Sequence, residues 1–230
     1  MKRIVLALVC LMTIASTNAQ NVQYYNTKHE VGITVGSGSV TQIFSGLADF
    51  MMIPISALVT STISLGSYTG HYSYGDESYF PAITAEYYYH VNELIGLGGF
   101  LAFNGMSRDM YVEGTYNYSQ DKTTHKIKTG EASRYNFSLI PTAKFDWLRK
   151  KNFGMYSKVG VGVSFMFEHQ KDELDSNSSA KATDETDTTI IPNLQCSLLG
   201  LEGGSEAIRG FVELGFGEQG IMLAGVKYKF

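Results

Sequence analysis

Residues 221–230, Ile-Met-Leu-Ala-Gly-Val-Lys-Tyr-Lys-Phe, decide the fold expected for this chain. Every second side chain from Phe230 back to Met222 is apolar, whereas Lys227 and Lys229 fall on the opposite face. A period of two residues is the pattern of a β-strand. An apolar face opposite lysines, ending on an aromatic residue, is typical of the closing strand of a transmembrane β-barrel, which meets lipid outside and polar groups inside.

The first 19 residues have the features of a secretory signal peptide. Lys2 and Arg3 give a positive start, residues 4–14 are almost all apolar, and small residues precede Gln20. This apolar run falls short of the ~20 residues that a spanning helix needs, so an N-terminal membrane anchor is the weaker alternative. We therefore predict a signal peptide over 1–19 and one barrel domain over 20–230.

The composition of the mature chain limits its partners. Without Lys2 and Arg3, 16 basic residues stand against 22 acidic ones, and this net charge of −6 argues against nucleic acid as a partner. Cys196 is the only cysteine outside the predicted signal peptide, so no internal disulfide can form. The 24 glycines, 15 tyrosines and 13 phenylalanines suit a tightly curved barrel with rings of aromatic side chains.

Seven further segments alternate between apolar and polar residues in the same way. The clearest covers 134–147, where Tyr135 and Asn136 begin two opposite faces and Pro141 predicts a bulge. We predict eight strands, over residues 30–37, 81–91, 94–104, 134–147, 153–168, 189–200, 208–217 and 221–230.

The links between these strands alternate in length. The short links are residues 92–93, 148–152 and 202–207. The long links are residues 38–80, 105–133 and 170–188, and a last, tight outer link lies near Glu218 and Gln219. Short periplasmic turns and long outer loops are the barrel pattern, and an even strand number places both termini in the periplasm. This topology gathers aromatic residues in two girdles, one with Tyr89, Trp147, Phe153, Tyr228 and Phe230 and one with Phe103, Tyr135, Phe165, Phe167 and Phe216.

The terminal residues 225–230, Gly-Val-Lys-Tyr-Lys-Phe, resemble the C-terminal signal of the small outer-membrane barrels. That family contains the transmembrane domain of outer-membrane protein A and its single-domain relatives from Gram-negative bacteria. The resemblance implies that the barrel-insertion machinery reads this strand. Residues 38–80 are longer than the first loop of the compact family members, and we expect no peptidoglycan-binding domain after the last strand.

Alternation directs many charged residues into the barrel. They are Glu30, Glu86, His90, Lys144, Asp146, Lys158, Glu168, Arg209, Glu213, Lys227 and Lys229. Eight strands leave just enough room for side chains, so we expect an interior plugged by salt bridges, with a narrow water or ion path as the alternative. We expect Glu86 or Glu213 to pair with Lys158 or Lys144.

Two outer segments are unusual. Residues 43–65 are apolar with one charge, Asp49, and Leu47, Phe50, Met51 and Leu58 follow helical spacing. We interpret this segment as a short helix, broken near Pro54, that folds over the barrel mouth or rests in the outer leaflet.

Two alternatives to that interpretation stay open, a loop packed on its own neighbours and a surface that binds a partner or lipid. The second segment, 170–188, is acidic and predicts a solvated loop, because its carboxylates lack the spacing of a calcium site.

The sequence predicts no catalytic, cofactor-binding or metal-binding residues. Alternation separates His169 from Ser164 and Glu168, so these residues make no triad. The five histidines, at positions 29, 71, 90, 125 and 169, show no ligand spacing.

We therefore expect an all-β protein, an eight-stranded antiparallel transmembrane β-barrel in the cell outer membrane with a long first outer loop. Its expected role is structural or surface-interacting and not enzymatic. The expected partners are outer-membrane lipids and lipopolysaccharide, the insertion machinery and an extracellular partner at the loops. The alternatives are a narrow channel, an outer-membrane lipid-modifying enzyme and a soluble lipocalin-like barrel.

Overall fold

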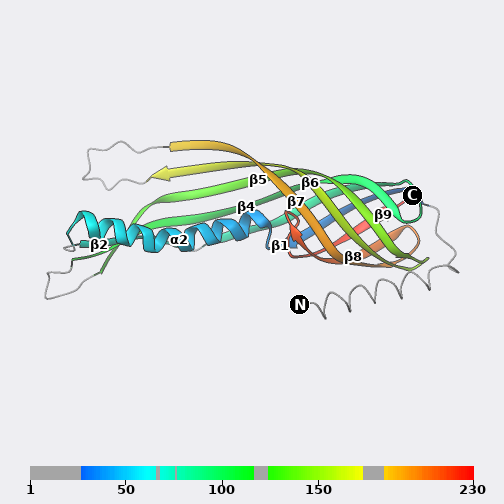
Figure 1. Cartoon of the computed structure of the whole chain (residues 1–230), viewed down its shortest axis with the longest axis horizontal. Coiled ribbons are helices and arrows are strands. Elements are labelled where there is room, and N and C mark those ends of the chain that lie inside the picture. Colours follow the sequence, from blue (N-terminus) through cyan, green and yellow to red (C-terminus); the bar gives the residue numbers. More distant parts are fainter. Residues whose placement is uncertain (1–26, 66–67, 76, 117–123, 173–183) are drawn as a thin grey trace.

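The computed structural model describes residues 27–65, 68–75, 77–116, 124–172 and 184–230 (Figure 1). The predicted signal peptide over 1–19 lies outside these residues. The described part contains, in chain order, β1 (His29–Ser37), α2 (Val40–Ile63), β2 (Tyr68–Tyr74), β3 (Ser78–His90), β4 (Ile95–Tyr116), β5 (Thr124–Arg149), β6 (Phe153–Asp172), β7 (Asp184–Gly204), β8 (Ile208–Gly217) and β9 (Met222–Lys229).

Eight of these strands close into an antiparallel ring. Strand β1 pairs with both β3 and β9, and β4 pairs with β5, which joins the two ends of the strand order. Strand β2 is added outside the ring, where it pairs with the far part of β4, from Tyr68 opposite Tyr116 to Tyr74 opposite Met110. The predicted all-β fold and antiparallel ring are thereby confirmed.

The wall of the ring is apolar outside and polar inside. Along β1, Val31, Ile33 and Val35 are 39–65% exposed, whereas Glu30 and Thr34 on the opposite face are buried. Strand β9 repeats this pattern, with both lysines buried and the alternate apolar side chains exposed. A soluble protein has the reverse distribution, because it buries its apolar side chains and leaves most charges in water.

The two ends of the barrel differ. We call the end where β1 begins and β9 finishes the termini end; the short turns at 91–94, 150–152 and 205–207 lie there. We call the opposite end the helix end, because α2 begins there. Aromatic side chains meet on the outer wall at both ends. His29 and Phe230 stack with ring centroids 5.2 Å apart at the termini end, and Phe103 and Tyr135 stack at 6.2 Å near the helix end.

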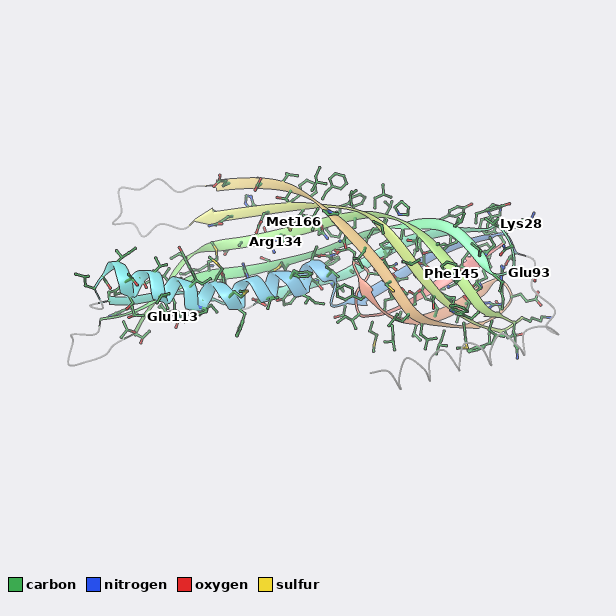
Figure 2. All side chains as sticks on the ribbon, viewed as in Figure 1. Lys28, Glu93, Glu113, Arg134, Phe145 and Met166 are labelled. Carbon is green, nitrogen blue, oxygen red and sulfur yellow. The ribbon has the colours of Figure 1, made fainter. Side chains whose placement is uncertain are left out.

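Strands β4 to β7 continue beyond the helix end as an open sheet, with β2 at one edge (Figure 1). The predicted loop over 105–133 is wrong, because β4 and β5 stay paired as far as Thr115 opposite Thr124. Figure 2 places Glu113 on this extension, far from Lys28 and Glu93 at the termini end.

Cross-strand ion pairs hold the extension together. Lys126 Nζ lies 3.0 Å from Glu113, and Lys128 Nζ lies 3.1 Å from Asp109. Hydrogen bonding to Lys126, and then to Ser73, lowers the pKa of the Glu113 carboxyl. Such strands carry polar groups on both faces, so they lack the apolar alternation by which strands are recognised in a sequence.

The predicted broken helix is in fact one continuous helix of 24 residues, α2, with Pro54 inside it. A capping box at Ser39 starts the helix. The Ser39 hydroxyl accepts a hydrogen bond from the Gln42 amide at 3.3 Å, and the Gln42 side chain accepts one from the Ser39 amide at 3.2 Å. The helix then runs from the barrel along the extension (Figure 1). Within the described residues, no helix has both the length and the hydropathy needed to cross a bilayer.

Several strand pairs contain a register shift, although not at the predicted position. Pro141 lies opposite Gly99 in a regular stretch, so the bulge expected there is wrong. Two of the shifts lie between Asp146 and Leu148 of β5 and between Ser197 and Leu199 of β7. Each shift turns the following residues to the opposite face of the sheet, which matters for the barrel interior.

Candidate functional site

The termini end of the barrel holds a cluster of ion pairs around two carboxylates. The Glu30 carboxylate accepts hydrogen bonds from Lys144 at 2.7 Å and from Lys227 at 3.0 Å. The Glu202 carboxylate lies 2.6 Å from Arg209 and 3.1 Å from Lys227, and it also bonds Lys229. All these side chains are almost completely buried. Each acid therefore faces several cations, as a buried carboxylate requires.

His90 joins this cluster from β3. Its Nε2 atom lies 3.5 Å from Glu30, and its Nδ1 atom lies 3.2 Å from Asp146. Lys144, on β5, contacts both of these acids. Its Nζ atom lies 3.5 Å from the Asp146 carboxylate. The imidazole thus lies between two carboxylates that share one lysine.

A second cluster fills the middle of the barrel. Lys158 Nζ lies 2.9 Å from Glu86 and 2.7 Å from Glu213. The Tyr156 hydroxyl donates to Glu213 at 2.5 Å, and its ring lies 4.1 Å from Lys227 Nζ. Tyr156 therefore connects the middle cluster to the cluster at the termini end.

A third group closes the helix end around a carboxylate with no cation beside it among the described residues. Glu218, in the β8–β9 turn, accepts hydrogen bonds from Asn193 at 2.8 Å, from Thr41 at 2.8 Å, and from Asn104 and Asn136. These donors come from β7, α2, β4 and β5. Several polar donors can stabilise a buried anion in place of a cation.

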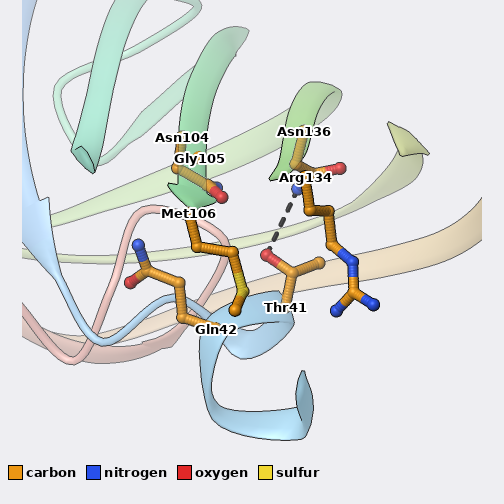
Figure 3. Close-up of a pocket in the computed structure, with 7 residues that line it drawn as sticks. All are labelled: Thr41, Gln42, Asn104, Gly105, Met106, Arg134 and Asn136. Atoms are coloured by element: carbon orange, nitrogen blue, oxygen red, sulfur yellow. Dashed lines mark hydrogen bonds between the residues drawn. The ribbon is translucent and has the colours of Figure 1, made fainter. Parts of the chain in front are cut away.

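Little space remains beside this group. A cavity of about 10 Å³ lies between α2 and the wall, and beside it Asn136 donates to Thr41 at 3.3 Å. Figure 3 shows the residues that line this cavity. That volume is close to the minimum for a single water molecule. Arg134 lines the outer side of the same cavity and bonds Glu168 (Figures 2 and 3). The first turn of α2 therefore packs closely into the barrel mouth.

The buried charges balance. Six acidic and six basic side chains are buried in the described part of the barrel, with His90 in addition. The acids are Glu30, Glu86, Asp146, Glu202, Glu213 and Glu218, and the bases are Lys144, Arg149, Lys158, Arg209, Lys227 and Lys229. Such a network fills the barrel with polar groups and adds no net charge to its interior.

Most interior residues lie where the sequence predicts. Lys158 pairs with both Glu86 and Glu213, as expected, whereas Lys144 pairs with Glu30 and Asp146 instead. The predicted interior position of Glu168 is wrong. Its side chain is 43% exposed beyond the barrel mouth, where it bonds Arg134.

Sequence reasoning missed Glu202, Glu218 and Arg149. Glu202 falls in the short link predicted over 202–207, and regular alternation along β7 would direct it outward. Leu198 and Leu199 both face outward, and this shift returns Glu202 to the interior. The adjacent pair of leucines is the signal that could have revealed it. Glu218 lies in a turn that folds inward, for which alternation gives no signal.

The residues considered for catalysis do not come together. Ser164 lies in the barrel mouth, 2.6 Å from the Ser138 hydroxyl, while His169 contacts Thr186 at 3.2 Å on the extension. Among the described residues, no three His, Cys, Asp or Glu side chains are grouped as metal ligands. The acidic link at 170–188 is strand at both ends, and its centre lies outside the described residues.

No family model matches this chain, and no curated protein matches it either.

Proposed function

We propose that this chain is an outer-membrane β-barrel protein, with a plugged barrel as its anchor and the extension and α2 as its interacting part. The observation that carries the proposal is the wall of the ring, which is apolar on its outer face and charged on its inner face. An aqueous environment would not stabilise the exposed apolar side chains that cover this wall, whereas a bilayer would.

The orientation follows from the same pattern. The termini end, with its short turns, corresponds to the periplasmic side, and the extension corresponds to the outside of the cell. The charged strands of the extension fit water rather than lipid. The signal peptide and the C-terminal strand fit export followed by assembly through the barrel-insertion machinery, with lipopolysaccharide as the neighbouring lipid.

The plugged state is supported by the size and burial of the interior side chains. Tyr88, Tyr156, Phe100 and Arg209 are each at most 2% exposed. A narrow channel is the second candidate, because most of the buried side chains in the interior are polar or charged. Recording from pure protein in planar bilayers separates the two, and we expect no reproducible conductance steps. Regular steps would favour the channel.

The membrane assignment is tested by mobility on gels. A folded transmembrane barrel is expected to migrate differently before and after boiling and to be extracted only with detergent. Release into plain buffer would favour the soluble lipocalin-like barrel instead. Comparing lipid A with and without the protein tests the lipid-modifying enzyme, for which we expect no change in acyl pattern.

A further inference from the structure

Helix α2 is amphipathic, but its polar face packs against the protein and its apolar face is exposed. The side chains that it turns toward the rest of the chain are hydroxyls. Ser56 accepts from the Tyr72 amide at 3.2 Å, and Thr60 accepts from the Gly70 amide at 2.9 Å, both on the open edge of β2. Ser64 accepts from the Tyr68 amide at 3.2 Å at the next turn. This polar stripe covers a sheet edge that would otherwise be free to pair.

The apolar side chains of α2 point the other way. Leu47, Met51 and Leu58 lie opposite the polar stripe and are 52%, 57% and 69% exposed. None of the large apolar side chains described in α2 is buried, and eleven of them are at least 36% exposed. A helix with this surface is normally covered by another apolar surface.

The exposed apolar area is on the scale of a protein interface. A large apolar side chain presents ~150–200 Å² when free, so the eleven half-exposed ones present on the order of 1,000 Å² in total around the helix. About half of this area lies opposite the polar stripe, on Phe44, Leu47, Met51, Ile55 and Leu58. Specific protein interfaces bury about 800 Å² on each partner, an area that a helix contacting two neighbours in a bundle can supply.

The charges beside α2 argue for protein rather than lipid as its cover. The strands next to its second half carry the ion pairs Lys126–Glu113 and Lys128–Asp109, with Lys126 46% exposed. Such strands belong in water, beyond the apolar band of the barrel. The cover of the second half of α2 therefore has to be apolar and also lie outside the bilayer.

Symmetry favours a second copy of this chain. The axis of α2 runs along the length of the molecule, as do the strands of the extension (Figure 1). All copies in one membrane have the same orientation, so a closed symmetric assembly has its axis along the membrane normal. Such an axis brings α2 of one copy beside α2 of the next, and the helices run parallel.

We propose that copies of this chain associate through a parallel bundle of α2 helices, with Leu47, Met51 and Leu58 at its centre. This inference rests on the proposed function, because the common orientation comes from the membrane. Since β2 already holds the polar stripe, the apolar face is presented in advance and association needs no rearrangement of the helix.

Disulfide trapping in membranes tests the bundle. The protein carries Leu58→Cys in a Cys196→Ser background, and the matched control carries Val59→Cys, which is also exposed but about 100° around the helix. Mild oxidation is expected to convert most of the Leu58→Cys protein to dimer and little of the control. Leu58→Cys that stays monomeric, or that joins a different protein, overturns the proposal.

A mixing experiment tests whether the α2 helices run parallel or antiparallel. Two differently tagged copies carry Leu47→Cys and Leu58→Cys, positions ~16 Å apart along the helix axis. Parallel helices give only the two homodimers, whereas cross-linking between the two tags would show antiparallel helices and overturn the proposal. In detergent, Leu47→Asp with Leu58→Asp is expected to reduce the sedimenting species to monomer.

The same membrane samples distinguish a failure of this inference from a failure of the proposed function on which it rests. Heat-modifiable mobility and recovery in the outer-membrane fraction report on the barrel. If both are present and Leu58→Cys does not dimerise, the bundle is wrong and the barrel stands. If both are absent, the membrane assignment itself fails.

Discussion

Thr41 donates a hydrogen bond of 2.8 Å to Glu218, 177 residues later in the chain. This contact joins the first turn of α2 to the β8–β9 turn inside the barrel mouth. It therefore ties the exposed helix to the most enclosed part of the molecule, and it fixes where the helix leaves the barrel.

Replacing Glu218 is expected to release α2. Glu218→Ala leaves three asparagine amides and the Thr41 hydroxyl without their common acceptor, and each unsatisfied buried group costs ~1–3 kcal/mol. Amide hydrogen exchange at residues 40–43 is expected to accelerate strongly. The control is Glu206→Ala, which removes an exposed carboxylate paired with Lys151. Unchanged protection in Glu218→Ala would show that the helix does not depend on this contact.

Removing a buried lysine is expected to destabilise the barrel. Lys158→Met leaves Glu86 and Glu213 buried without their cation, a change that costs ~3–5 kcal/mol. Urea unfolding in lipid vesicles, followed by the fluorescence of the single tryptophan, Trp147, measures it. Lys151→Met, whose side chain is 71% exposed, should stay within ~0.5 kcal/mol of the unmodified protein. Equal stabilities would mean that the interior network contributes little.

Charge substitutions on the outer surface are expected to map the bilayer. Val161 on the barrel wall is 70% exposed and Ile127 on the extension is 54% exposed. Val161→Arg should cost ~2–4 kcal/mol if lipid covers the wall, while Ile127→Arg should cost almost nothing in water. The free energy of unfolding from vesicles gives both values. Similar costs at the two positions would contradict the placement of the membrane around the barrel.

Two glycines are expected to respond in opposite ways to alanine. A Cβ atom at Gly36 would lie 1.8 Å from the Gln219 carbonyl oxygen, so Gly36→Ala has to displace the turn that closes the barrel mouth. A Cβ atom at Gly46 on α2 meets no atom within 4 Å, so Gly46→Ala should stabilise the helix by ~0.5–1 kcal/mol. Thermal unfolding of both variants checks this contrast. A tolerated Gly36→Ala would show that the turn is loosely held.

Much of the barrel could be predicted because alternation is local. The outward and inward faces of β1, β8 and β9 follow directly from residues two positions apart. The extension could not be predicted in this way. Its strands are held by backbone pairing and by ion pairs such as Lys126–Glu113, and polar residues on both faces leave no periodic signal.

The sequence by itself determined the antiparallel ring, its reversed wall and the inward lysines of the last strand, because each follows from a period of two. Only the tertiary structure decided which acid meets which base, that Glu202 enters the barrel, and that α2 turns its hydroxyls to the sheet and its apolar side chains outward. The physical reason is that these features depend on contacts between residues far apart in the chain. A shift of one residue at Leu198 and Leu199, or a sheet edge in need of hydrogen-bond partners, changes the environment of residues far away in the chain.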